Sequence, residues 1–146
     1  MKLSNFRDQI DHDRIVAAIR AAEGQSRGEI RVHVVHHSIG DAEAAAAVAF
    51  TKLGMTATAE RNGVLIYVAP RSQRFAVVGD TAIHERCGPA FWRAVAAAME
   101  QAFREGRFTD GLVEGISTVG EALAREFPRD AGKSDKNELP DTVSEE

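Results

Sequence analysis

The stretch GVLIYVA at residues 63–69 constrains the fold more than any other segment of the chain. It is apolar on both alternating sets of positions. A strand with one face in water alternates apolar and polar residues, whereas a strand covered on both faces is apolar throughout. We therefore expect 63–69 to be the central strand of a sheet that carries helices on both faces.

Two further segments have the pattern of strands. In GEIRVHVVHH the apolar residues Ile30, Val32 and Val34 alternate with polar ones, as in a half-buried strand. The segment 74–80, RFAVVGD, follows the central strand after a connection of hairpin length. The first strand reaches 63–69 through a helix, so these two strands should be parallel with a right-handed crossover. The strand at 74–80 should be the antiparallel neighbour of 63–69.

Four segments place apolar residues at the spacing of an amphipathic helix. Their apolar stripes are Ile15, Ile19 and Ala22; Ala46, Ala49, Phe50 and Leu53; Trp92, Val95, Met99, Ala102 and Phe103; and Leu112, Ile116, Val119, Gly120, Leu123 and Phe127. Gly120, on the apolar face of the last helix, predicts a close approach of that helix to a sheet. The order of elements predicts an α/β fold: a three-layer α/β/α sandwich with a small mixed sheet.

The chain of 146 residues is long enough for one domain and too short for two ordinary ones. We expect a single domain over residues 1–127. From Pro128 the sequence PRDAGKSDKNELPDTVSEE lacks aromatic residues and any apolar period, and carries six acids against three bases. This composition predicts an acidic disordered tail over residues 128–146.

The charge balance bears on the class of partner. The chain has 18 basic against 22 acidic residues, a net charge of -4, so no basic excess exists to neutralise a nucleic-acid backbone. No apolar stretch approaches the length of a membrane-spanning helix, and the first residues lack the apolar core of a secretory leader. Cys87 is the single cysteine. We expect a cytoplasmic protein without a membrane span, and a protein partner is compatible with it; the oligomeric state is left open.

Polar residues from the strands should converge at one end of the sheet. The hairpin brings Asp80 beside Arg61 and Asn62 at the start of the central strand, and near Glu29 at the start of the first. His84, four residues after Asp80, shares a face with it if a helix begins there. Carboxylates with an imidazole suit a divalent cation. In the alternative, Asp80 caps the following helix and pairs with Arg61.

Other chemical signatures are weak. Three histidines, His33, His36 and His37, lie toward the opposite end of the sheet, but their spacing along a regular strand does not let two of them chelate one ion, so we expect surface histidines. The alternative is that a bend at residues 38–40 brings a pair of them together with Asp41 as metal ligands. The sequence contains no phosphate-binding loop, dinucleotide-binding glycine motif or nucleophile elbow. No motif supports a particular reaction.

Taken in order, SRGEIRVHV, FTKLGM, RNGVLIYVAPRSQRFAVVGD and FREGRFTDGLVEGI resemble the TPM domain family over about residues 11 to 127. The resemblance implies an α/β/α sandwich, in a bacterial-type member without signal peptide or membrane segment. It also implies weak acid phosphatase activity, calcium binding, or accessory roles in assembling or repairing membrane complexes. Where relatives often show G-Y-G-L-E followed by an Asp, this chain has VGDTAIHERC. Gly79 matches, Asp80 replaces the aromatic, and Glu85 fills the Glu position with a shift of one or two residues.

Three functional hypotheses follow. The first is a non-catalytic accessory or binding protein that acts through protein contacts, for which an exposed apolar patch of several hundred Å2 is expected. The second is a divalent-cation domain of the calcium type. Its ligands would be Asp80, His84, Glu85 and Glu29. The third is a weak, metal-assisted acid phosphatase in which Arg61 and Asn62 would hold the anion.

Overall fold

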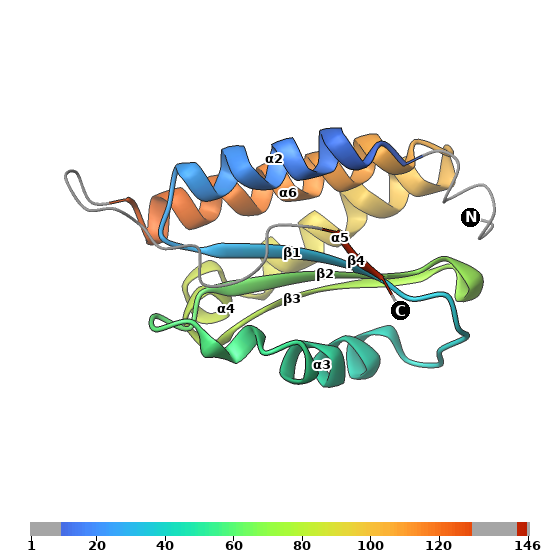
Figure 1. Ribbon diagram of the computed structural model, residues 1–146, viewed down its shortest axis with the longest axis horizontal. Coiled ribbons are helices and arrows are strands. Elements are labelled where there is room, and N and C mark those ends of the chain that lie inside the picture. The colour runs from blue at the N-terminus through green and yellow to red at the C-terminus, as the bar shows by residue number, and fades with distance from the viewer. Residues whose placement is uncertain (1–9, 130–142, 146) are drawn as a thin grey trace.

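The computed structural model describes residues 10–129 and 143–145 of the chain. The helices are α2 (His12–Gly24), α3 (Ala42–Lys52), α4 (Thr81–Cys87), α5 (Pro89–Arg104) and α6 (Phe108–Glu126), and the strands are β1 (Glu29–Val34), β2 (Gly63–Ala69), β3 (Arg74–Gly79) and β4 (Val143–Glu145). Two short 3-10 turns are η1 (Met55–Ala57) and η2 (Pro70–Ser72). Figure 1 shows the sheet between α2, α5 and α6 on one face and α3 on the other. The α/β/α sandwich is confirmed.

The strand order in the sheet is β3-β2-β1-β4. β1 and β2 are parallel, with Glu29 opposite Gly63, and β2 and β3 are antiparallel, with Val64 opposite Gly79. Every residue of β2 is buried. The predicted central strand and both of its predicted neighbours are therefore confirmed.

Two apolar clusters, one on each face of the sheet, explain why β2 is apolar throughout. Val64, Ile66 and Val68 belong to the cluster with α2, α5 and α6. Leu65 and Tyr67 point to the opposite face of the sheet and pack in the cluster with α3. Alternate side chains of one strand thus serve both halves of the core, as expected for a strand covered on both faces.

Gly120 was predicted to allow a close approach of its helix to the sheet, and this prediction was wrong about the partner. A Cβ at Gly120 would lie 2.6 Å from the Cβ of Ala22, which belongs to α2, so the close approach joins two helices rather than a helix and the sheet. Helices α2 and α6 lie side by side in Figure 1. A periodic apolar stripe does not reveal whether the surface it meets belongs to a sheet or to another helix.

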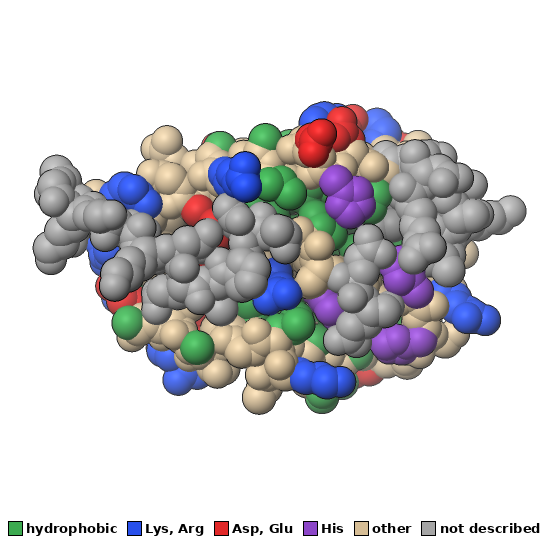
Figure 2. Space-filling model, in the orientation of Figure 1, with side chains coloured by type: hydrophobic (Ala, Val, Ile, Leu, Met, Phe, Trp, Pro, Cys, Tyr) green, Lys and Arg blue, Asp and Glu red, His purple; other side chains and the backbone are tan. Residues whose placement is uncertain are grey.

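The strand β4 differs from the prediction for the tail. Residues 143–145 pair in parallel with β1, and Val32 lies opposite Val143, so disorder does not hold for this segment; residues 130–142 and 146 lie outside the described part. His33 is 1% exposed, with its Nδ1 2.7 Å from the hydroxyl of Ser144. The expectation of a surface histidine was wrong there because the tail returns to cover β1. In Figure 2 other histidines gather near the end where β1 finishes.

None of the helices in the described part has both the length and the apolar character needed to cross a membrane.

Candidate functional site

Asp80 lies at the end of the sheet where polar residues were predicted to converge, and its carboxylate is held by several hydrogen bonds. Its side chain is 4% exposed, and its two oxygens accept hydrogen bonds from the Nε of Arg61 at 2.8 Å and from an Nη of Arg61 at 3.1 Å. One oxygen also accepts the amide of Thr81 at 2.7 Å, at the start of α4. The carboxylate thus pairs with a guanidinium and caps a helix, the alternative described above.

Arg61 supports the same helix from the end of the preceding turn. Its backbone lies in the left-handed region, with φ of 53°, and its carbonyl accepts the amide of Ala82 at 3.2 Å. The hydrogen bonds that Arg61 donates to Asp80, together with the negative charge of Asp80, raise the pKa of Arg61. Main chain and side chain of Arg61 together hold the start of α4 against the start of β2. This arrangement is that of a structural clamp.

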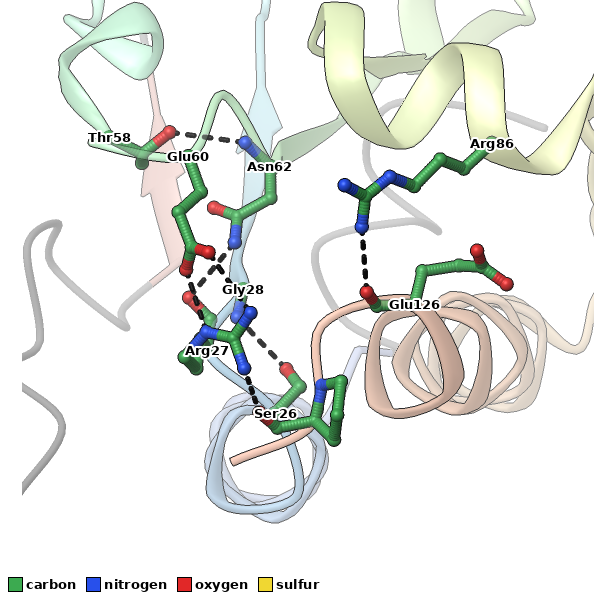
Figure 3. Close-up of polar contacts among 9 residues, drawn as sticks. Ser26, Arg27, Gly28, Thr58, Glu60, Asn62, Arg86 and Glu126 are labelled. Carbon is green, nitrogen blue, oxygen red and sulfur yellow. Dashed lines mark hydrogen bonds and ion pairs between the residues drawn. The ribbon is translucent and has the colours of Figure 1, made fainter. Parts of the chain in front are cut away.

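Asn62 lies in a second polar cluster, shown in Figure 3. It is 1% exposed, and its side-chain nitrogen donates to the carbonyl of Arg27 at 3.1 Å while its backbone amide donates to Thr58 at 3.2 Å. Arg27 in turn forms a two-pronged pair with Glu60, at 2.8 and 3.0 Å. The side-chain oxygen of Asn62 is buried without a hydrogen bond to a described residue, and it is an acceptor, which does not suit an anion.

The other predicted ligands are only partly brought together. His84 and Glu85 are exposed and line one hollow with Asp80, whereas Glu29 is buried on β1, with β2 between it and the end of β3. The His84 ring stacks on Trp92, 5.9 Å between centroids. Across the described residues, no group of three or more His, Cys, Asp or Glu side chains is arranged to hold a metal ion. The cation site stays a prediction.

A long groove follows the outer edge of β3, with α3 on one side and α5 and then α4 on the other. It consists of three hollows of about 660, 330 and 400 Å3. The first and second share Phe75, Arg93 and Ala96, and the second and third share Ala47 and Val78, so the hollows are continuous. We call this feature the β3 groove. Its walls are low because alanines face it from both helices.

The floor of the β3 groove is a row of main-chain groups. The amide of Asp80 donates to the carbonyl of Gly63, its partner in register, at 2.9 Å. Because hydrogen-bonded and non-bonded pairs alternate in an antiparallel ladder, the N–H and C=O of Phe75, Val77 and Gly79 point away from β2. β3 is the outermost strand on this side, so these groups face the groove.

Sequence reasoning missed the β3 groove although one signal was present. Residues 63–69 were predicted as the central strand, with 74–80 as its neighbour. This arrangement already implies that 74–80 is an edge strand. The groove residues themselves gave no indication, because Ala47, Ala96 and Ala97 are ordinary helix formers. Their consequence, a hollow beside a strand, depends on how the helices are placed over the sheet.

These features define the class of the protein: an α/β/α sandwich with a mixed sheet in which β3 is an edge strand. The TPM domain model matches residues 5–122, which is most of the sequence. The chain therefore belongs to the TPM domain family, as the resemblance of its motifs implied. Among the curated proteins, none matches it.

Two solved structures are similar to this chain. The BA42 protein from the psychrophilic bacterium Bizionia argentinensis has a TM-score of 0.84 and 39% identity, over 94% of this chain and 95% of that one. The N-terminal domain of the cg2496 protein from Corynebacterium glutamicum has a TM-score of 0.61 and 21% identity, over 80% of this chain and 75% of that one. The second likeness concerns the fold alone.

Proposed function

We propose that this TPM domain is a non-catalytic binding module that contacts a partner protein through the β3 groove. The observation that carries the proposal is the open edge of β3. Its outward main-chain groups, at Phe75, Val77 and Gly79, lie at the floor of a continuous groove. Exposed strand edges pair readily with another chain unless they are covered or blocked, so an open and accessible edge supports a role in binding.

The exposed apolar patch that was expected for a binding protein is not found on the described surface. Val48, 68% exposed, is the one large apolar side chain that stands out on the surface of the described residues, so no broad apolar patch of the expected kind is present there. A partner recognised through main-chain hydrogen bonds does not require such a patch. The accessory roles implied by the family resemblance agree with a contact of this type.

The metal and phosphatase hypotheses receive less support from the polar end of the sheet. A cation at Asp80 would have to displace Arg61 from both carboxylate oxygens, and an anion at Arg61 would have to displace Asp80. The clamp at α4 already accounts for both residues. Because of this, we assign no catalytic function to them.

A peptide-display selection on the immobilised protein tests the proposal. Peptides selected on the wild type are rebound to Ala96→Phe, which fills the groove at a residue shared by two of its hollows. The matched control is Ala98→Phe, an exposed alanine of the same helix. We expect binding to fall at least about tenfold in the first variant and to persist in the second. A selection that yields no peptide sensitive to Ala96→Phe would reject the groove as a binding site.

The proposal includes the cytoplasmic location and the absence of nucleic-acid binding expected from the sequence. Cell fractionation tests the location, and electrophoretic mobility of labelled DNA and RNA tests the second expectation.

A further inference from the structure

Building on the proposed function, we infer that the β3 groove binds an extended segment of a partner protein, which adds to β3 as a new strand and places an acidic side chain near Arg74 and Arg93. The inference concerns the occupant of the groove and therefore goes one step beyond binding itself. It rests on the main-chain groups of the floor, the size of the walls and the charges at each end.

The floor of the groove matches the hydrogen-bonding pattern of one strand. Phe75, Val77 and Gly79 each turn an N–H and a C=O outward, at every second residue. An extended chain offers the same spacing, since its own donors and acceptors also alternate sides. A helix uses its main-chain groups internally and could not pair with this row. The main-chain pattern therefore selects an extended occupant.

The walls of the groove leave room for side chains on both faces of the added strand. Ala96 and Ala97 of α5 lie on one side, and Ala42 and Ala47 of α3 on the other. Successive side chains of an extended segment point alternately toward these two walls. Medium-sized apolar residues such as valine would contact the alanines and Phe75. A second copy of this domain would instead have to bring its own two helices against these walls.

Charge gives the groove two different ends. Arg74 lines the hollow at the start of β3, and Arg93 lines both this hollow and the middle one. No ion pair joins either guanidinium to a described carboxylate, and Arg74 donates to the carbonyl of Gly40. Arg104 at the same end is paired with Glu100 at 2.8 Å. The positive charges left over at this end complement an acidic side chain.

Carboxylates line the middle and far hollows of the groove, and Arg93 also lines the middle one. Glu43 lies on the wall formed by α3, and Glu85 lies at the far end beside His84. An acidic residue of the partner is therefore disfavoured at the far end and favoured beside Arg74 and Arg93. The bound segment should carry its acidic side chain at one end only.

Synthetic peptides titrated into the 15N-labelled full chain test this inference. Three peptides share six alternating valines and threonines: one carries two glutamates at its amino end, one carries them at its carboxyl end, and one carries two lysines at its amino end. We expect the amide signals of Phe75, Val77 and Gly79 to shift. One glutamate peptide should bind about fivefold more tightly than the lysine peptide, with the difference reduced by salt. The glutamate peptide that binds better indicates the strand direction.

Two variants make the result specific. Val77→Pro removes an outward N–H without removing a hydrogen bond to β2, and should weaken every peptide about tenfold. Arg93→Glu changes an exposed side chain and should reverse the charge preference even if the proline variant fails to fold. Ala98→Phe is the control and should leave all affinities unchanged.

The outcomes separate this inference from the proposed function. If selected peptides depend on Ala96 but bind as helices, or without a response to Arg93→Glu, the extended acidic occupant is wrong and the binding module stands. If the β3 signals shift with protein concentration alone, the occupant is a second copy and the inference is again wrong. If no peptide depends on Ala96, both proposals fail.

Discussion

Gly120 holds helices α2 and α6 at a short distance, and its replacement by alanine tests their packing. A Cβ at this position would lie 2.6 Å from the Cβ of Ala22 and 3.3 Å from its Cα. The second atom belongs to the backbone, so relief requires that one helix move away from the other. Overpacking of a well-packed core costs about 1–3 kcal/mol, and we expect the upper part of that range here.

Helix propensity opposes this cost. Alanine in place of glycine in a helix interior contributes about 1 kcal/mol of stability. The net expectation for Gly120→Ala is a loss of about 2 kcal/mol in the free energy of unfolding. In a domain of this size the loss corresponds to a fall of roughly 6–10 °C in Tm.

Gly115 in the same helix provides the control. A Cβ there would meet the Sδ of Met99 at 2.6 Å and its Cγ at 3.1 Å, which are atoms of a flexible side chain. Methionine adapts to such changes by rotating about its side-chain bonds. The gain in propensity should nearly cancel the cost, and Gly115→Ala should change the free energy of unfolding by less than about 1 kcal/mol.

Circular dichroism during heating and urea unfolding of both variants measures these differences. The two substitutions change the same number of atoms in one helix, so a difference between them reports the surroundings of each glycine. Gly120→Ala as stable as the wild type would refute the close contact between α2 and α6. An equal loss in both variants would refute the distinction between a backbone and a side-chain neighbour.

Two further predictions concern ionisable groups. Hydrogen bonding from Arg27 lowers the pKa of Glu60 below its ordinary value of 4.5, so this pair stabilises the fold above that pH and the contribution is lost as pH falls through the lowered pKa. The Tm of Glu60→Gln should lie below that of the wild type near neutral pH, and the two curves should converge in acid. Millimolar calcium added to the EDTA-treated protein should leave Tm unchanged, because Arg61 engages both oxygens of Asp80.

Each of these predictions has a decisive opposite result. A constant gap in Tm between wild type and Glu60→Gln across the acid range would show that the charge of Glu60 is not the source of stability. Calcium at about 100 times its dissociation constant adds about 2.7 kcal/mol, a shift of several degrees. Such a shift, present in the wild type and lost in Asp80→Asn, would establish the cation site and reject our interpretation of the clamp.

The apolar pattern of the chain was sufficient to predict the sheet around β2. A strand that is buried on both faces needs apolar residues at successive positions, and GVLIYVA has this pattern. The hairpin length and the intervening helix then determined the directions of the two neighbouring strands. These are local rules, which depend on residues close together in the sequence.

Contacts between distant segments were not predictable in the same way. The partner of Gly120 lies almost a hundred residues earlier, in α2, and β4 joins β1 from the other end of the chain. Three residues of a polar tail carry too little apolar pattern to indicate a strand. Their pairing depends on the edge that β1 offers, so the burial of His33 could not be read from its own neighbourhood.

At the polar end of the sheet, the sequence predicted which side chains lie close together, but it did not predict what they do there. Asp80 and Arg61 meet as expected, but residue types alone did not distinguish a ligand from a helix cap. The distinction depends on which atoms are already engaged. Both oxygens of Asp80 accept hydrogen bonds from Arg61, and one also accepts the amide of Thr81.

A binding site of the kind we propose for the β3 groove leaves no motif in the sequence. Catalytic and metal sites need particular side chains, and these leave recognisable spacings in a sequence. A strand edge binds through N–H and C=O groups that every residue except proline possesses, so almost any sequence can form it. What the sequence controls is whether the edge stays accessible. In this chain small residues such as Ala47 and Ala96 line the edge, and in our proposal Arg93 supplies the charge that discriminates among partners.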